Sequence, residues 1–223
     1  QEWARHSRRE DGVNALFLAS VGGHLEFVKT LIQELGIEWA RNCKRDNGAD
    51  ALIAASEGGY LEVVKILIHE LGQEWARNSK MEDGTDPLIA ASEGGHLEVV
   101  KTLIHELGQE WARHSRREDG VNALFLASVG GHLEFVKTLI QELGIEWARN
   151  CKRDNGADAL IAASEGGYLE VVKILIHELG QEWARNSKME DGTDPLIAAS
   201  EGGHLEVVKT LIHELGQEWA RHS

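Results

Sequence analysis

The sequence is poor in proline, cysteine, methionine and tyrosine, with two residues of each among 223. It contains no apolar run near the roughly 20 residues that a membrane-spanning helix needs. The first residues show neither the basic start nor the apolar segment of a secretion signal. We therefore expect no membrane partner and a cytoplasmic location.

Positive charge is also in short supply. The chain has 23 basic and 37 acidic residues, which gives a formal net charge of −14. A nucleic acid is a polyanion that needs a basic surface, so nucleic acid is not expected as a partner. The 42% of hydrophobic residues is enough to order a folded protein and argues against a disordered acidic tail.

Tryptophan and glycine, with 7 and 24 residues, are placed periodically along the chain. Residues 109–216 repeat residues 1–108 without a change. A fixed period of this size is typical of a solenoid, in which each unit contacts only its neighbours. We therefore expect a single domain over residues 1–223. Its units are 1–36, 37–72, 73–108, 109–144, 145–180 and 181–216, with a partial unit at 217–223.

Each unit contains a signal for a short first helix. In the third unit, Asp86 is suited to cap a helix that begins at Pro87. The pair Gly94 and Gly95 ends it, because glycine enters left-handed conformations cheaply. The same capping position is held by Asn14 and Asp50 in the first two units.

A longer second helix follows, over residues 97–107. Its apolar residues recur at spacings of three and four, which predicts one buried stripe. They are Leu97, Val100, Leu103, Ile104 and Leu107. Gly108 ends this helix, and the polar stretch 109–119 predicts an exposed loop. The sequence therefore predicts an all-α fold of helix-turn-helix units joined by long loops.

The run Gly-Thr-Asp-Pro-Leu-Ile-Ala-Ala-Ser-Glu-Gly-Gly-His-Leu-Glu-Val-Val-Lys, from Gly84 to Lys101, resembles the ankyrin repeat, and the match recurs in all six units. The histidine of the Thr-Pro-Leu-His motif is absent and is replaced by Phe17, Ile53 or Ile89. In typical ankyrin repeats this histidine and threonine help to tie neighbouring units by hydrogen bonds. The resemblance therefore implies that an apolar side chain supplies the contact here. The 36-residue period exceeds the usual 33, which implies a modified finger loop.

The resemblance also implies a non-enzymatic surface that binds other proteins through finger loops and first helices on its concave side. The units differ mainly at their positions 6 to 18, within these same segments. Such variation fits a tuned contact surface, or drift in a tolerant loop. The candidate partner-binding residues are Arg8, Arg9, Lys44, Arg45, Lys80, Met81, Arg116, Arg117, Lys152, Arg153, Lys188 and Met189.

One tryptophan stands at the third position of every unit. We expect these side chains to pack between consecutive units, with an aromatic ladder for a ligand as the alternative. An arginine two residues further on, such as Arg41 after Trp39, is expected to add a cation–π contact. The predicted packing residues are Trp3, Trp39, Trp75, Trp111, Trp147, Trp183 and Trp219.

No catalytic site, metal site, cofactor or small-molecule substrate is expected. Equivalent histidines on stacked helices stand roughly 8 to 10 Å apart, whereas zinc holds each nitrogen at about 2 Å. A Ser20–His24 pair becomes Ser56 and Tyr60 in the next unit, which lacks a base. We therefore do not expect an enzyme. Cys43 and Cys151 lie three units apart and are expected to be free thiols.

Self-association is the alternative to a separate protein partner. Leu16 and Val28 in the first unit, like Leu196 and Val208 in the last, match the interior pattern, so we see no polar caps. Head-to-tail contact between copies that does not close makes a filament. On this reading the chain is a structural array, either a piece of a longer natural one or an engineered concatemer, and both origins stay open.

Overall fold

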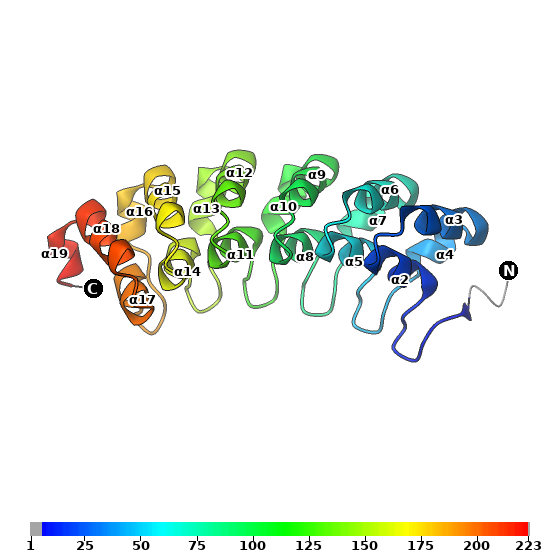
Figure 1. Ribbon diagram of the computed structural model, residues 1–223, viewed down its shortest axis with the longest axis horizontal. Helices are drawn as coiled ribbons and strands as arrows, with labels where there is room; N and C mark the ends of the chain where they lie inside the picture. The colour runs from blue at the N-terminus through cyan, green and yellow to red at the C-terminus, as the bar shows by residue number, and fades with distance from the viewer. Residues whose placement is uncertain (1–5, 223) are drawn as a thin grey trace. The chain divides into compact units, whose positions relative to one another are not determined.

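The computed structural model describes residues 6–222, which form 18 helices and no β-strand (Figure 1). The chain divides into two compact units, Gln1–Arg117 and Glu118–Ser223. The predicted all-α class with repeated helix-turn-helix units is confirmed. No helix among residues 6–222 is both long and apolar enough to cross a membrane.

Each repeat begins with a short first helix and continues with a longer second helix. The first helices are α2 (Ala15–Val21), α5 (Ala51–Glu57), α8 (Pro87–Glu93), α11 (Ala123–Val129), α14 (Ala159–Glu165) and α17 (Pro195–Glu201). The second helices are α3 (Leu25–Leu35), α6 (Leu61–Leu71), α9 (Leu97–Leu107), α12 (Leu133–Leu143), α15 (Leu169–Leu179) and α18 (Leu205–Leu215). Within each unit, the finger loops extend on the side of the first helices (Figure 1).

A third, very short helix carries the tryptophan of each repeat, so the predicted loop over 109–119 is wrong in its first half. The third helices are α4 (Ile37–Arg41), α7 (Gln73–Arg77), α10 (Gln109–His114), α13 (Ile145–Asn150), α16 (Gln181–Arg185) and α19 (Gln217–Ala220). A helix of this length is unstable alone. It forms because it packs on the preceding second helix, as α10 does on α9. Ala76 and Ala112, at the centre of α7 and α10, are fully buried.

The predicted start of each first helix is confirmed. The Oδ1 atom of Asp86 accepts hydrogen bonds from the backbone N–H groups of Leu88 and Ile89, at 2.9 and 3.0 Å. Asp50 caps α5 in the same way, whereas Asn14 accepts from one N–H group, that of Phe17. These bonds satisfy donors that the first turn of a helix leaves unpaired.

The glycine pair that ends each first helix is required for two reasons. Gly59 has a φ of 73°, in the left-handed region that glycine tolerates. A Cβ atom on it would also lie 2.4 Å from the ring of His96. This ring belongs to the next repeat, and its Nε2 lies 2.9 Å from the carbonyl oxygen of Glu57. The histidine at this turn therefore packs on the preceding repeat.

The core of each unit lies between its helices. In α9, Val100, Leu103, Ile104 and Leu107 are buried as predicted, and Leu97 is half-buried. In the first compact unit, Gln1–Arg117, α5 packs between α2 and α8, and α6 packs between α3 and α9. In the second unit α14 packs between α11 and α17, and α15 between α12 and α18. This leaves the finger loops outside the helical core.

Candidate functional site

The finger loops of the first, second, third, fifth and sixth repeats are hairpin turns held by their own backbone. In the second repeat the N–H of Arg45 donates to the carbonyl of Ala49 at 2.8 Å, and the N–H of Gly48 donates to that of Arg45 at 3.0 Å. Neighbouring fingers are also joined, because the N–H of Glu82 donates to the carbonyl of Asn47 at 3.0 Å. The fingers within a unit therefore form an ordered surface.

The two adjacent candidate residues in each finger have different environments. The first is basic in every repeat and exposed. These residues are Arg8, Lys44, Lys80, Arg116, Lys152 and Lys188. Of the second residues, Arg9 is exposed and the others are half-buried, namely Arg45, Met81, Arg117, Arg153 and Met189.

The half-buried arginines contact the preceding repeat. The guanidinium carbon of Arg45 lies 5.4 Å from the centre of the Phe17 ring, and its Nη2 lies 3.4 Å from Asp11 Oδ2. Arg153 makes the same contacts with Phe125, at 5.3 Å, and Asp119, at 2.8 Å. These two predicted partner-binding side chains are thus engaged within the chain.

Arg117 also contacts the preceding repeat, but through different groups. Its Nε donates to Thr85 Oγ1 at 2.8 Å, and its Nη2 pairs with the Glu93 carboxylate. A fourth engaged residue is Lys44, whose Nζ lies 4.0 Å from Asp50 Oδ2. Sequence reasoning missed these contacts because they join residues 24 to 34 positions apart or depend on how the finger folds back.

The tryptophans and the arginines that follow them make a reciprocal contact between repeats. The indole N–H of Trp75 donates to the carbonyl of Arg41 at 3.2 Å, and Arg41 Nε donates to the carbonyl of Leu71 at 3.0 Å. Trp111 and Arg77 repeat this arrangement. The guanidinium thus bonds to a carbonyl, and the cation–π contacts among residues 6–222 lie at Arg45 and Arg153.

Two further tryptophans make the same indole hydrogen bond. Trp183 and Trp219 donate to the carbonyls of Arg149 and Arg185, at 3.1 and 3.2 Å. Trp39 and Trp147 are half-buried like the rest, and Trp3 lies outside the described residues.

A buried hydrogen bond between side chains crosses the joints on the finger side. The hydroxyl of Ser79 donates to Asp50 Oδ1 at 2.8 Å, and Ser115 donates to Asp86 at the same distance. Ser187 donates to both carboxylate oxygens of Asp158 at 2.7 Å. The expectation that an apolar side chain replaces the missing motif histidine is therefore incomplete, because a polar bond also ties the repeats.

The two residues that meet at this joint differ between repeats in a correlated way. Where the cap is aspartate, the next repeat supplies serine, whereas Asn14 is followed by Cys43 and Asn122 by Cys151. A buried carboxylate needs a strong donor, and a thiol is a weak one. Burial raises the pKa of the Cys43 thiol to about 12, so this side chain is neutral. Comparing position 14 of each 36-residue repeat with position 7 of the next repeat would have found this pairing from the sequence.

Burial of the capping aspartates disfavours their charged form. Burial raises the pKa of Asp50, although the Ser79 hydroxyl, the N–H groups of Ile53 and Leu52 and the charge of Lys44 oppose the shift. Asp86 and Asp158 are raised for the same reason. Each joint bond therefore compensates for a carboxylate that has lost its water.

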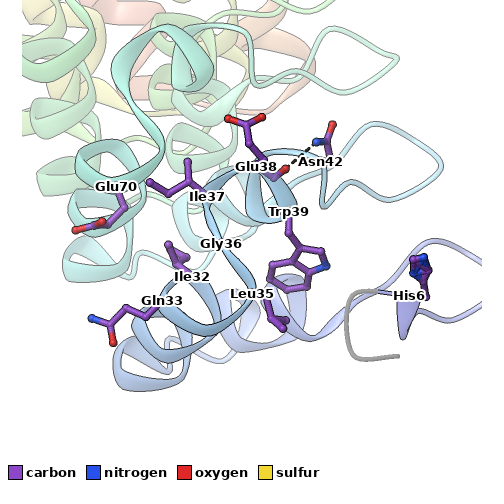
Figure 2. Close-up of a pocket in the computed structure, with 10 residues that line it drawn as sticks. All are labelled: His6, Ile32, Gln33, Leu35, Gly36, Ile37, Glu38, Trp39, Asn42 and Glu70. Carbon is purple, nitrogen blue, oxygen red and sulfur yellow. Dashed lines mark hydrogen bonds between the residues drawn. The ribbon is translucent and has the colours of Figure 1, made fainter. Parts of the chain in front are cut away.

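A pocket of about 780 Å³ is lined by His6, Ile32, Leu35, Trp39 and Glu70, among others (Figure 2). The indole of Trp39 lies beside Leu35, and His6 stands apart from both (Figure 2). No group of three possible metal ligands occurs among residues 6–222. The candidate surface therefore consists of fingers and first helices.

A model of ankyrin repeats matches the chain in three copies, over residues 2–79, 71–151 and 145–221. The matches together span nearly all of the sequence. No curated protein matches the chain.

Replacing Ser79 by alanine tests the buried joint. The Ser79→Ala change leaves the Asp50 carboxylate without its side-chain donor, and we expect the free energy of unfolding to fall by about 1 to 3 kcal/mol. Urea unfolding measures it. Ser56→Ala is the matched control, because the Ser56 hydroxyl is buried without a partner in the described part of the chain. Equal losses in the two variants would contradict the role given to Ser79.

The raised pKa of Asp50 predicts a pH effect of definite sign. The folded chain binds this proton more tightly than the unfolded chain, so the Asp50 contribution to stability falls as pH rises from its ordinary value through its raised value. Asp50→Asn should flatten the fall in melting temperature over that range.

Asp191→Asn serves as the opposite control. The backbone N–H of Thr193 lowers the pKa of Asp191, so its contribution to stability is lost as pH falls. Its replacement should remove a rise in melting temperature with pH below the ordinary pKa of aspartate, and it should leave the fall above that value unchanged. An unchanged profile in Asp50→Asn would contradict the account of the capping carboxylates.

Proposed function

Since the chain belongs to the ankyrin-repeat family, we propose that it is a non-enzymatic scaffold that binds protein partners through its finger loops and first helices. Ankyrin repeats are generally scaffolds for protein–protein interaction. The observation that carries the proposal is the arrangement in the fingers of Arg45, Arg117 and Arg153, where this arginine contacts the preceding repeat and the basic residue before it faces solvent.

The exposed residues form the part of the candidate set that is free to reach a partner. Arg8 and Lys80 in the first unit, like Lys152 and Lys188 in the second, stand on fingers whose backbones are fixed by hydrogen bonds. Arg116 is exposed at the equivalent position of the fourth finger. A row of cations on such fingers loses little backbone freedom on binding. It is suited to acidic side chains of a partner protein.

The half-buried candidates have an indirect role in this proposal. Arg45, Arg117 and Arg153 hold each finger against the preceding repeat and so position the exposed residue beside them. Met81 and Met189 occupy the same place in repeats where the preceding first helix carries Ile53 or Ile161.

A second copy of the chain is the alternative partner, and one observation favours it. Arg117 binds Thr85 and Glu93, and the same two residue types recur as Thr193 and Glu201. Arg9 has the repeat position of Arg117 and is exposed. Head-to-tail contact in the 223-residue chain would then join Arg9 of one copy to Glu201 of another, and repetition of that contact makes a filament.

Charge reversal on the fingers tests the scaffold. Peptides rich in aspartate or glutamate that bind the chain should lose about 10-fold or more in affinity when Arg8, Lys80 and Arg116 are changed together to glutamate. The control changes Lys65, Lys101 and Lys173 to glutamate. It alters net charge equally but lies on second helices, where each lysine forms an exposed pair with a glutamate of the same helix. Equal effects of the two sets would contradict binding through the fingers.

Sedimentation velocity over a range of protein concentrations tests self-association. If copies associate head to tail, the mean sedimentation coefficient should rise with concentration. It should fall in high salt, which screens exposed ion pairs. Arg9→Glu should abolish the rise, and Arg9→Glu combined with Glu201→Arg should restore it. A chain that remains monomeric at every concentration excludes this alternative.

A further inference from the structure

The first helices differ in the side chains that they expose. In α2, Leu18 and Val21 are 45% and 47% exposed, and Phe17 is half-buried. The equivalent residues of α5 are Ile53, Ala54 and Glu57. We call Phe17, Leu18 and Val21 the apolar patch. The same residue types recur in the second unit as Phe125, Leu126 and Val129, of which Val129 is 48% exposed and the other two are half-buried.

The three residues of the apolar patch share one side of the helix. Val21 follows Phe17 by four residues and Leu18 by three, the spacings that place side chains next to each other on a helix. The chain has alanine and glutamate at the equivalents of Leu18 and Val21 in α5 and α8, so this backbone does not require apolar residues there. Clustered exposed apolar side chains mark interaction sites.

An unpaired carboxylate lies on the helix beside each apolar patch. Glu57 stands on α5 at the position of Val21, and α5 packs against α2. The corresponding Glu93 is paired with Arg117 of the next finger. The finger residue that would pair with Glu57 is Met81, and Glu57 makes no ion pair with any residue from 6 to 222.

The second unit repeats this arrangement. Glu165 stands on α14, which packs against α11, and the finger residue opposite it is Met189. Glu165 is exposed and forms no ion pair within the described part of the chain. Packed helix axes lie about 8 to 10 Å apart, so each free carboxylate is about that far from its apolar patch.

We propose that each unit binds one short segment of a partner protein, with an apolar side chain on the apolar patch and a lysine or arginine on Glu57 or Glu165. An extended chain advances about 3.3 Å per residue, so the two side chains stand about three residues apart. The net charge of −14 draws a basic segment towards the chain. This inference rests on the proposed scaffold function and names the segment that its first helices accept.

Short random peptides displayed on phage and selected on the full chain provide the probe. The enriched peptides should carry an apolar residue and a basic residue at this spacing. One enriched peptide is then synthesised and titrated calorimetrically, and it should bind with two equivalents per chain.

Substitutions that copy the neighbouring repeat locate the sites. Leu18→Ala with Val21→Glu should reduce binding from two equivalents to one and leave the affinity of the second site unchanged. Adding Leu126→Ala with Val129→Glu should abolish binding. These residues already stand at the equivalent positions of α5 and α14, so the backbone accommodates them.

The carboxylates are tested separately. Glu57→Gln with Glu165→Gln should weaken the peptide about 10-fold, as expected when one partner of an ion pair is removed. The same double variant should not alter binding of a peptide in which serine replaces the basic residue. That comparison separates a direct contact from a general loss of negative charge.

Three results would overturn the inference: no enriched peptide, enriched peptides without the apolar and basic pair, or binding that survives all four patch substitutions. Binding that depends on Arg8, Lys80 and Arg116 but not on the apolar patch would overturn this inference and leave the scaffold proposal intact. Binding that depends on neither region would overturn both.

Discussion

The contact between consecutive repeats is the constraint on which the rest of the structure depends. A seven-residue first helix and a five-residue third helix cannot hold their shape alone. They are fixed because neighbouring repeats cover their apolar faces and exchange hydrogen bonds. On one side the indole of Trp75 and the guanidinium of Arg41 bond to carbonyls across the joint, and on the other Ser79 bonds to Asp50.

These joints determine which side chains are left for binding. The capping aspartate serves its own helix and the next repeat at once, so it is buried and unavailable to a partner. The second finger residue is drawn inward in the same way when it is Arg45 or Arg117. What remains exposed is the first basic residue of each finger and, on the first helices, side chains such as Leu18, Val21 and Glu57. Those are also the places where the repeats differ without altering the fold.

Much of the fold could be predicted because its signals are local. The capping residues, the Gly94–Gly95 stop and the apolar stripe of residues 97–107 each lie within a few positions of the element that they define. The third helix was missed because its sequence is mostly polar and its stability comes from packing on the second helix. The environment of the finger arginines was missed because Phe17 and Arg45 meet only when two repeats stack.

The candidate site was therefore predicted at the level of segments and not of side chains. Variation among the 36-residue repeats indicates the fingers and first helices as the candidate binding segments. It does not distinguish Lys80, which faces solvent, from Arg117, which bonds to Thr85. That distinction depends on the direction in which the finger folds back. The Asp50–Ser79 pair is different, because its signal was present in the sequence as a correlated change between successive units.

The dependence of stability on the number of repeats tests the central claim most directly. Chains of residues 1–72, 1–108, 1–144 and 1–180 would be unfolded in urea beside the full chain. If the joints supply most of the stability, the free energy of unfolding should rise with each added repeat. A free energy of unfolding that is the same at every length would show that each repeat is stable by itself, and it would contradict the account.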